Sequence, residues 1–177
     1  MFKAWSAKKC EKGAKLVIAQ HGGHFGMSEV SFYEKHQVDI SDKWISWGWK
    51  DVNNKKIIPA FSFKLTGDVI KENTNGDGLL VSMTVPRYAG RMMDCTISGQ
   101  WLEYFKDNCD FLNFLPKNIR TEINISPSLS NRHGWDDEKR FRHYFPENSI
   151  KKATIESKLK NSRICICTYN GTTMLEA

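Results

Sequence analysis

Long apolar segments and paired cysteine motifs are missing from this sequence of 177 residues. No uninterrupted apolar run approaches the roughly 18 to 20 residues that a membrane span needs, which excludes a transmembrane helix. The basic N-terminal segment 1–13 lacks an apolar stretch, so we do not expect it to be a secretory signal. The five cysteines are scattered without any Cys-x-x-Cys spacing. Their pattern favours reduced cytosolic thiols over disulfides or a zinc site.

The composition indicates a folded protein with a positive charge. Hydrophobic residues make up 40% of the chain and aromatic residues 12%, which is enough to bury a core and excludes a disordered tail. The 26 lysines and arginines exceed the 20 acidic residues and give a net charge of +6. This excess fits an anionic ligand such as a nucleotide or a phosphorylated lipid. The basic residues do not form a stripe, and most aromatic residues follow core periodicity, so we expect no nucleic-acid partner.

Short apolar runs alternate with segments of helical periodicity, and a polar, glycine-rich segment at 71–78 indicates a linker. The predicted strands are 15–20, 43–49, 57–59, 78–84, 121–126 and 163–168, the last of them expected to be buried. Helices are predicted at 92–115, 136–144 and 155–159. Two more are predicted to begin at Ser28 and after Gly171. This alternation predicts an α/β fold with mainly parallel strands. Ligands then bind outside the carboxyl ends of the strands, so we look for function in the loops at those ends.

A loop with two histidines and three glycines, Gln20-His21-Gly22-Gly23-His24-Phe25-Gly26, directly follows the first predicted strand. Glycines let the backbone approach a ligand closely, and the imidazole of His21 can act as a general base. A plain turn with an incidental histidine is an equal alternative. A zinc site is a weaker one, because these histidines are not spaced four apart on a helix as a metalloprotease pair would be. Its ligands would be His21, His24, Glu29, Glu34 and His36.

The C-terminal segment 168–176 combines a strand end, a turn and the start of a helix. The free N–H groups of a helix start and the hydroxyls of Thr172 and Thr173 can hold a phosphate. Glu176, one turn further on, can accept hydrogen bonds from ribose hydroxyls. The alternative is that a threonine only caps the helix. A P-loop is excluded because no Gly-Lys-Ser/Thr follows.

Two further loops carry charged residues next to predicted elements. Arg87, in the segment Pro86-Arg87-Tyr88 after the strand 78–84, can bind a diphosphate with its fork of donors. A solvated arginine is the equal alternative at this position. The segment 131–138 contains a histidine and three carboxylates, which we interpret as the N-terminus of a helix rather than a catalytic pair.

Several blocks of the chain resemble a bacterial family of surface-carbohydrate transferases found in gene clusters for capsule or O-antigen synthesis. These blocks are 11–26, 34–36, 40–49, 86–88, 134–135 and 168–176. That family is in turn similar to GT-B glycosyltransferases and, distantly, to CDP-glycerol polymer transferases, in which two Rossmann-like domains face a cleft. The resemblance implies the closing part of an acceptor-side domain at 1–66, a linker at 67–76 and the opening part of a nucleotide-donor domain at 77–177. Because members of the family are longer at both ends, we expect a fragment with both domains incomplete and inactive by itself.

The resemblance also implies roles for individual residues. His21 would be the base or phosphate partner beside Gly22 and Gly23, and Arg87 would face the leaving diphosphate. Thr172, Thr173 and Glu176 would hold the nucleotide. The implied activity is transfer of a sugar from a nucleotide-sugar donor to a glycan or lipid-linked acceptor, in the cytoplasm, with peripheral membrane association and without a metal ion or cofactor. Two alternatives stay open: a phosphotransferase using a CDP-alditol donor, and a non-catalytic scaffold that binds nucleotides or glycans.

Overall fold

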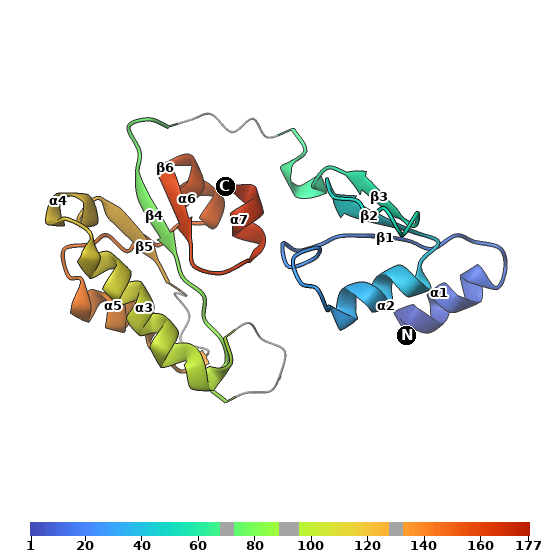
Figure 1. Ribbon diagram of the computed structural model, residues 1–177, viewed down its shortest axis with the longest axis horizontal. Helices are drawn as coiled ribbons and strands as arrows, with labels where there is room; N and C mark the ends of the chain where they lie inside the picture. The colour runs from blue at the N-terminus through green and yellow to red at the C-terminus, as the bar shows by residue number, and fades with distance from the viewer. Residues whose placement is uncertain (68–72, 89–95, 128–132) are drawn as a thin grey trace. The chain divides into compact units, whose positions relative to one another are not determined.

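The computed structural model describes residues 1–67, 73–88, 96–127 and 133–177. The chain divides into two compact units, residues 1–69 and 70–175, each of which we describe by itself (Figure 1). Each unit contains a three-stranded sheet in which all strand pairs are parallel. Helices connect the strands, so the expected α/β, Rossmann-like fold with parallel sheets is confirmed. Part of the expected linker, 68–72, lies outside the described residues, and the assignment of the units to acceptor and donor stays a prediction.

The first unit is a small sheet of order β1-β2-β3, with Trp44 at its centre. Trp44 is fully buried on β2, and Phe25, Val38 and Ile57 complete the core around it. The elements of this unit are α1 (Phe2–Cys10), β1 (Val17–Ala19), α2 (Phe32–Ile40), β2 (Lys43–Trp47), β3 (Ile57–Ala60) and the short 3-10 helix η1 (Phe63–Leu65).

Helix α2 starts at a later serine than the sequence pattern predicted. The expected N-cap was Ser28, whereas the observed N-cap is Ser31, whose hydroxyl accepts a hydrogen bond from the backbone N–H of Glu34 at 3.3 Å. Ser31 and Glu34 have the Ser-x-x-Glu spacing of a capping motif, and Ser28 does not, because Ser31 stands three positions after it.

The second unit has the strand order β5-β4-β6, so the first strand in sequence lies in the middle. Its strands are β4 (Asp77–Val81), β5 (Ile123–Ser126) and β6 (Ser162–Cys167). Its helices are η2 (Ser98–Gln100), α3 (Trp101–Phe114), α4 (Lys117–Arg120), α5 (Asp137–Tyr144), α6 (Ile155–Lys160) and α7 (Thr172–Glu176). In the register, Val81 pairs with both Ser126 and Cys167, which aligns the carboxyl ends of all three strands.

Two layers of helices cover the second sheet, α3 and α5 on one side and α6 and α7 on the other (Figure 1). The larger core lies under α3 and α5, where Leu80 packs with Trp101, Phe105 and Phe141. Trp101 also stacks on Trp135, with 4.5 Å between the ring centroids. This packing includes Val85, which follows β4, and Trp135, which precedes α5, in the core.

The structure corrects two predictions in the second unit. The long helix expected at 92–115 is shorter: 92–95 lie outside the described residues, and helical structure begins only at Ser98, after Thr96 with its φ of +110°. A positive φ of this kind interrupts a helix. The strand expected to be buried at 163–168 is partly exposed, with Ile164 at 55%, because among the described strands β6 pairs with β4 alone. No helix in the described part of the chain is long and apolar enough to cross a membrane.

Candidate functional site

The histidine loop begins at the carboxyl end of β1, and a buried glutamine holds it in place. The side-chain amide of Gln20 donates to the backbone oxygen of Gly22 at 2.8 Å. Its oxygen accepts hydrogen bonds from the backbone N–H of Trp47 at 2.9 Å and from the indole N–H of Trp49 at 3.0 Å. Gln20 therefore fixes the loop against the end of β2, a role that its neutral side chain did not reveal in the sequence.

The loop exposes its imidazole groups and buries its backbone. His21 is exposed, whereas Gly22 and Gly23 are buried. The His21 ring meets the buried ring of Phe25 edge-on at 4.9 Å between centroids, and His24 lies 4.2 Å from the same ring. Partial burial lowers the pKa of His24, and the nearby His21 adds a smaller effect in the same direction. An exposed imidazole at the carboxyl end of a parallel strand suits a base or a phosphate partner, and this role of His21 stays a prediction.

Gly26 closes the loop in a conformation that requires glycine. Its φ is +75°, and a Cβ atom there would lie 2.6 Å from the ring of Trp49. The backbone N–H of Gly26 donates to the carboxylate of Glu34 at 2.6 Å, which ties the loop to α2. Glu34 therefore serves the backbone. No three metal-binding side chains converge in the described ranges.

A cavity of about 440 Å³ lies at the carboxyl ends of the three strands of the second sheet. The chain leaves β4 in one direction to reach β5 and returns on the other side to form β6, so this cavity lies where the strand order reverses. Open α/β sheets bind their ligands at such a point. The lining residues are Val81, Ser82, Met83, Thr84, Ser126, Pro127, His133, Ile155, Tyr169 and Thr173.

A chain of hydrogen bonds joins β4 to β6 beside this cavity. The backbone N–H of Met83 donates to the phenol oxygen of Tyr104 at 2.7 Å. The hydroxyls of Tyr104 and Thr168 are hydrogen-bonded, and the Thr168 hydroxyl donates to the backbone oxygen of Val81 at 3.0 Å. Since Thr168 donates to Val81, the Tyr104 hydroxyl is the donor to Thr168. Tyr104 thus positions the cavity-lining backbone from α3, although its sequence pattern indicated only a core residue.

The three C-terminal candidates all lie on α7. Thr173 lines the cavity, whereas Thr172 is the first residue of α7 and Glu176 the last. The N-cap of α7 is Gly171, and no side chain caps the helix, so the alternative that a threonine caps it is wrong. A Cβ atom at Gly171 would lie 2.2 Å from the ring of Tyr169, which explains the glycine.

Arg87 is exposed but fixed to the loop that borders the cavity. Its backbone N–H donates to the oxygen of His133, a cavity-lining residue, at 3.1 Å. Its guanidinium lies 5.4 Å from the ring centroid of Trp135 and donates to the oxygen of Gly134 at 3.4 Å. The structure therefore brings Arg87 and Thr173 to the same end of the second sheet. The meeting of these residues with His21, Gly22 and Gly23 of the first unit stays a prediction.

Comparison with known proteins identifies one family. A family model described as "LIC12162 family transferase" matches residues 1–177. Neither a curated protein nor a solved structure matches the chain.

Proposed function

The chain belongs to the LIC12162 family of transferases, and we propose that it transfers a sugar from a nucleotide-sugar donor to a surface-polysaccharide acceptor in a GT-B-like arrangement. The observation that carries the proposal is the cavity of about 440 Å³ at the carboxyl ends of β4, β5 and β6. Its volume lies within the range of roughly 300 to 1,000 Å³ that is typical of small-ligand sites. The donor, the acceptor and the cytoplasmic location are parts of this proposal.

The chemistry of the lining suits a nucleoside diphosphate. Ser82 and Thr173 line the cavity and their hydroxyls can donate hydrogen bonds to phosphate oxygens, whereas the Thr84 hydroxyl is hydrogen-bonded to the carboxyl group of Asp137. Arg87 stands beside it and can form two parallel hydrogen bonds to a phosphate. Negative charge grows on the departing nucleoside diphosphate in the transition state, so donors fixed in this way would stabilise it more than the ground state. Thr172 would add a hydroxyl, and Glu176 would accept hydrogen bonds from the ribose.

The first unit would supply the acceptor side. His21 would remove the proton from an acceptor hydroxyl or orient the donor phosphate, and its exposed imidazole supports either role. Gly22 and Gly23 are buried and would form the tight turn that presents the His21 imidazole to the ligand. Removing a general base typically lowers the rate by about a hundred- to ten-thousand-fold. We therefore expect His21→Asn to lower kcat by that amount in the intact protein and to leave donor binding unchanged, with the exposed His36→Asn as control.

The first test is binding to the full chain. Calorimetric titration with UDP, CDP, GDP and ADP is expected to find one nucleotide that binds, and Thr173→Val is expected to weaken it. Thr121→Val makes the same chemical change at the C-cap of α4, outside the cavity, and serves as the matched control. If none of the four nucleotides binds, or both valine variants behave alike, the cavity is not the donor site.

The second test identifies the group transferred. The intact protein is incubated with UDP-sugars or CDP-alditols and with lipid-linked glycan acceptors. Release of the nucleoside diphosphate from a nucleotide sugar supports the proposal. Release of CMP from a CDP-alditol alone would instead indicate a phosphotransferase. Nucleotide binding without any turnover would indicate a scaffold.

A further inference from the structure

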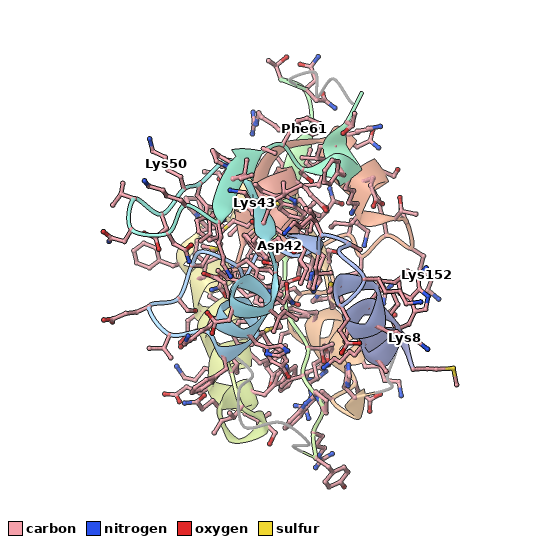
Figure 2. All side chains as sticks on the ribbon, turned by 90° about the vertical axis from the view of Figure 1, so that its right-hand side faces the viewer. Lys8, Asp42, Lys43, Lys50, Phe61 and Lys152 are labelled. Carbon is pink, nitrogen blue, oxygen red and sulfur yellow. The ribbon has the colours of Figure 1, made fainter. Side chains whose placement is uncertain are left out.

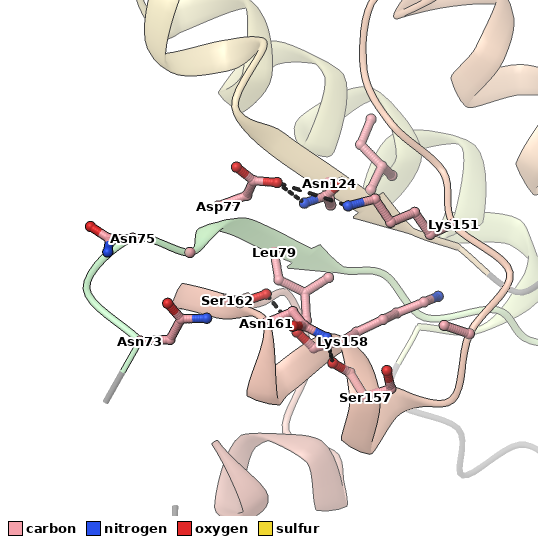
Figure 3. A pocket seen from close by; sticks show the side chains of 13 residues that line it. Asn73, Asn75, Asp77, Leu79, Asn124, Lys151, Ser157, Lys158, Asn161 and Ser162 are labelled. Carbon is pink, nitrogen blue, oxygen red and sulfur yellow. Dashed lines mark hydrogen bonds and ion pairs between the residues drawn. The ribbon is translucent and has the colours of Figure 1, made fainter. Parts of the chain in front are cut away.

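Lys158 is a cation beside the donor cavity that did not stand out in the sequence. It lies on α6, one turn after Ile155, and Ile155 lines the cavity. Side chains on a helix lean toward its N-terminus, so the Lys158 side chain runs back toward the carboxyl ends of the strands. Figure 3 shows it extended along β4 in the direction of the arrow, away from Asn73 and Asp77.

The ammonium group ends on a buried hydroxyl of the cavity. Lys158 Nζ donates to Ser126 Oγ at 2.9 Å. Ser126 is the last residue of β5, is 8% exposed and lines the cavity. Lys158 is not among the residues that line the 440 Å³ cavity; it lines the neighbouring pocket of about 340 Å³ drawn in Figure 3, and its ammonium reaches the cavity through Ser126. The charged end of the side chain therefore belongs to the carboxyl end of the sheet.

Lys158 has no counter-ion among the residues that the structure describes. Within the described ranges no carboxylate lies at ion-pair distance from its ammonium, and the Ser126 hydroxyl is its hydrogen-bond partner. The neighbouring Lys151 differs, because it lies 4.0 Å from the carboxylate of Asp77. Burial lowers the pKa of Lys158. A half-buried ammonium with unused donors costs stability, and an anion that pairs with it would remove this cost.

We propose that Lys158, held by Ser126, binds the diphosphate of the donor nucleotide in this cavity. The inference rests on the proposed function, because it takes the anion to be the diphosphate of the donor. Arg87 would approach the diphosphate from the loop after β4, and Lys158 would approach it from the end of β5. Two cations on separate strand ends can neutralise a diphosphate that one arginine alone would leave partly charged.

Lys158→Met tests the proposal in the full chain, by calorimetry with the best-binding nucleoside diphosphate, its nucleoside and inorganic pyrophosphate. Losing one hydrogen bond to a charged group should weaken diphosphate binding roughly 10- to 100-fold and leave nucleoside binding unchanged. Lys158→Arg should retain most of the affinity. Lys160→Met, an exposed lysine at the end of the same helix, should change nothing. The melting temperature of Lys158→Met should be equal to or higher than that of the wild type, since a half-buried, unpaired charge is removed.

The outcomes separate this proposal from the proposed function. If the wild type binds a nucleoside diphosphate and Lys158→Met binds it within twofold, the Lys158 assignment is wrong and the donor site stands. If pyrophosphate binds with dependence on Lys158 and no nucleotide binds, the anion site stands and the donor assignment is wrong. If nothing binds, both are wrong. If Ser126→Ala binds the diphosphate as tightly as the wild type, Ser126 does not hold Lys158 in place and that part of the proposal is wrong.

Discussion

Tyr104→Phe removes one oxygen from the carboxyl end of the second sheet and is expected to destabilise it measurably. The phenol oxygen accepts the backbone N–H of Met83 at 2.7 Å and donates to the Thr168 hydroxyl. In the variant, the Thr168 hydroxyl still donates to Val81, but the Met83 N–H loses its partner. An unsatisfied buried donor costs about 1 to 3 kcal/mol. Because Tyr104 and Met83 are only half-buried, we expect a loss at the lower end, about 1 to 2 kcal/mol.

Two measurements check this value. A loss of about 1 to 2 kcal/mol lowers the melting temperature of a domain of roughly 100 residues by about 4 to 15 °C. Hydrogen exchange is the more local measurement, because the amide of Met83 should exchange roughly tenfold faster in the variant if its hydrogen bond is worth about 1.4 kcal/mol. Nucleotide binding should weaken as well, since Met83 lines the cavity.

Tyr144→Phe is the matched control. Tyr144 lies on α5 of the same unit and is 59% exposed, so removing its hydroxyl should change stability by less than about 0.5 kcal/mol. If Tyr104→Phe behaves like this control and the exchange of the Met83 amide is unchanged, the hydrogen-bond chain does not hold the cavity. The assignment of Tyr104 as a positioning residue would then be refuted.

Three further changes test other parts of the fold. Gly26→Ala should lower the free energy of unfolding in urea by roughly 2 to 4 kcal/mol, because it adds a clash with Trp49 to the strain of a positive φ. Gly13→Ala is the control: its φ is +90° and no atom lies near its Cβ, so it should show the strain alone. Burial raises the pKa of Asp137, so its contribution to stability is present at low pH and is lost as the pH rises through the raised pKa. The free energy of unfolding of Asp137→Asn, relative to that of the wild type, should therefore be higher at pH 8 than at pH 4. An equal difference in the free energy of unfolding at both pH values would contradict the raised pKa. Burial raises the pKa of Cys109 to about 11. Its alkylation at pH 8 should be roughly a hundredfold slower than after unfolding, as measured by mass spectrometry.

The strands were predictable from the sequence because each of them contains apolar, often β-branched residues, either in a short run or alternating with polar ones. Helix starts were harder to predict, since they depend on single backbone conformations. The φ of +110° at Thr96, which precedes the helical structure from Ser98, has no signature in the sequence. Helix α1 was missed for another reason: none of its residues is buried, so it shows no apolar periodicity. Among these helix starts, only that of α2 could have been predicted correctly, because the Ser-x-x-Glu spacing favours Ser31 over Ser28 as its N-cap.

The candidate site was only partly accessible to sequence reasoning, because its residues come together through topology. Thr173 and Arg87 follow predicted strands, so their place at a carboxyl end could be expected. Ser126 also ends a predicted strand, but nothing in the order of the chain indicates that β4 lies between β5 and β6. Lys158 could not be found at all, since an isolated lysine on a short helix resembles any surface lysine. Its direction along the sheet follows only from where α6 packs.

The two cations beside the cavity, Arg87 and Lys158, have neutral partners. Arg87 contacts backbone oxygens and the ring of Trp135, and Lys158 contacts a hydroxyl. Elsewhere in this unit, by contrast, Arg142 pairs with the carboxylate of Glu138 at 2.8 Å. Neutral partners fix a cation without cancelling its charge, so an arriving diphosphate would have no internal carboxylate to displace. These side chains are already ordered in the folded protein, so binding the diphosphate costs less conformational entropy. For the same reason no reorganisation is needed when negative charge develops in the transition state.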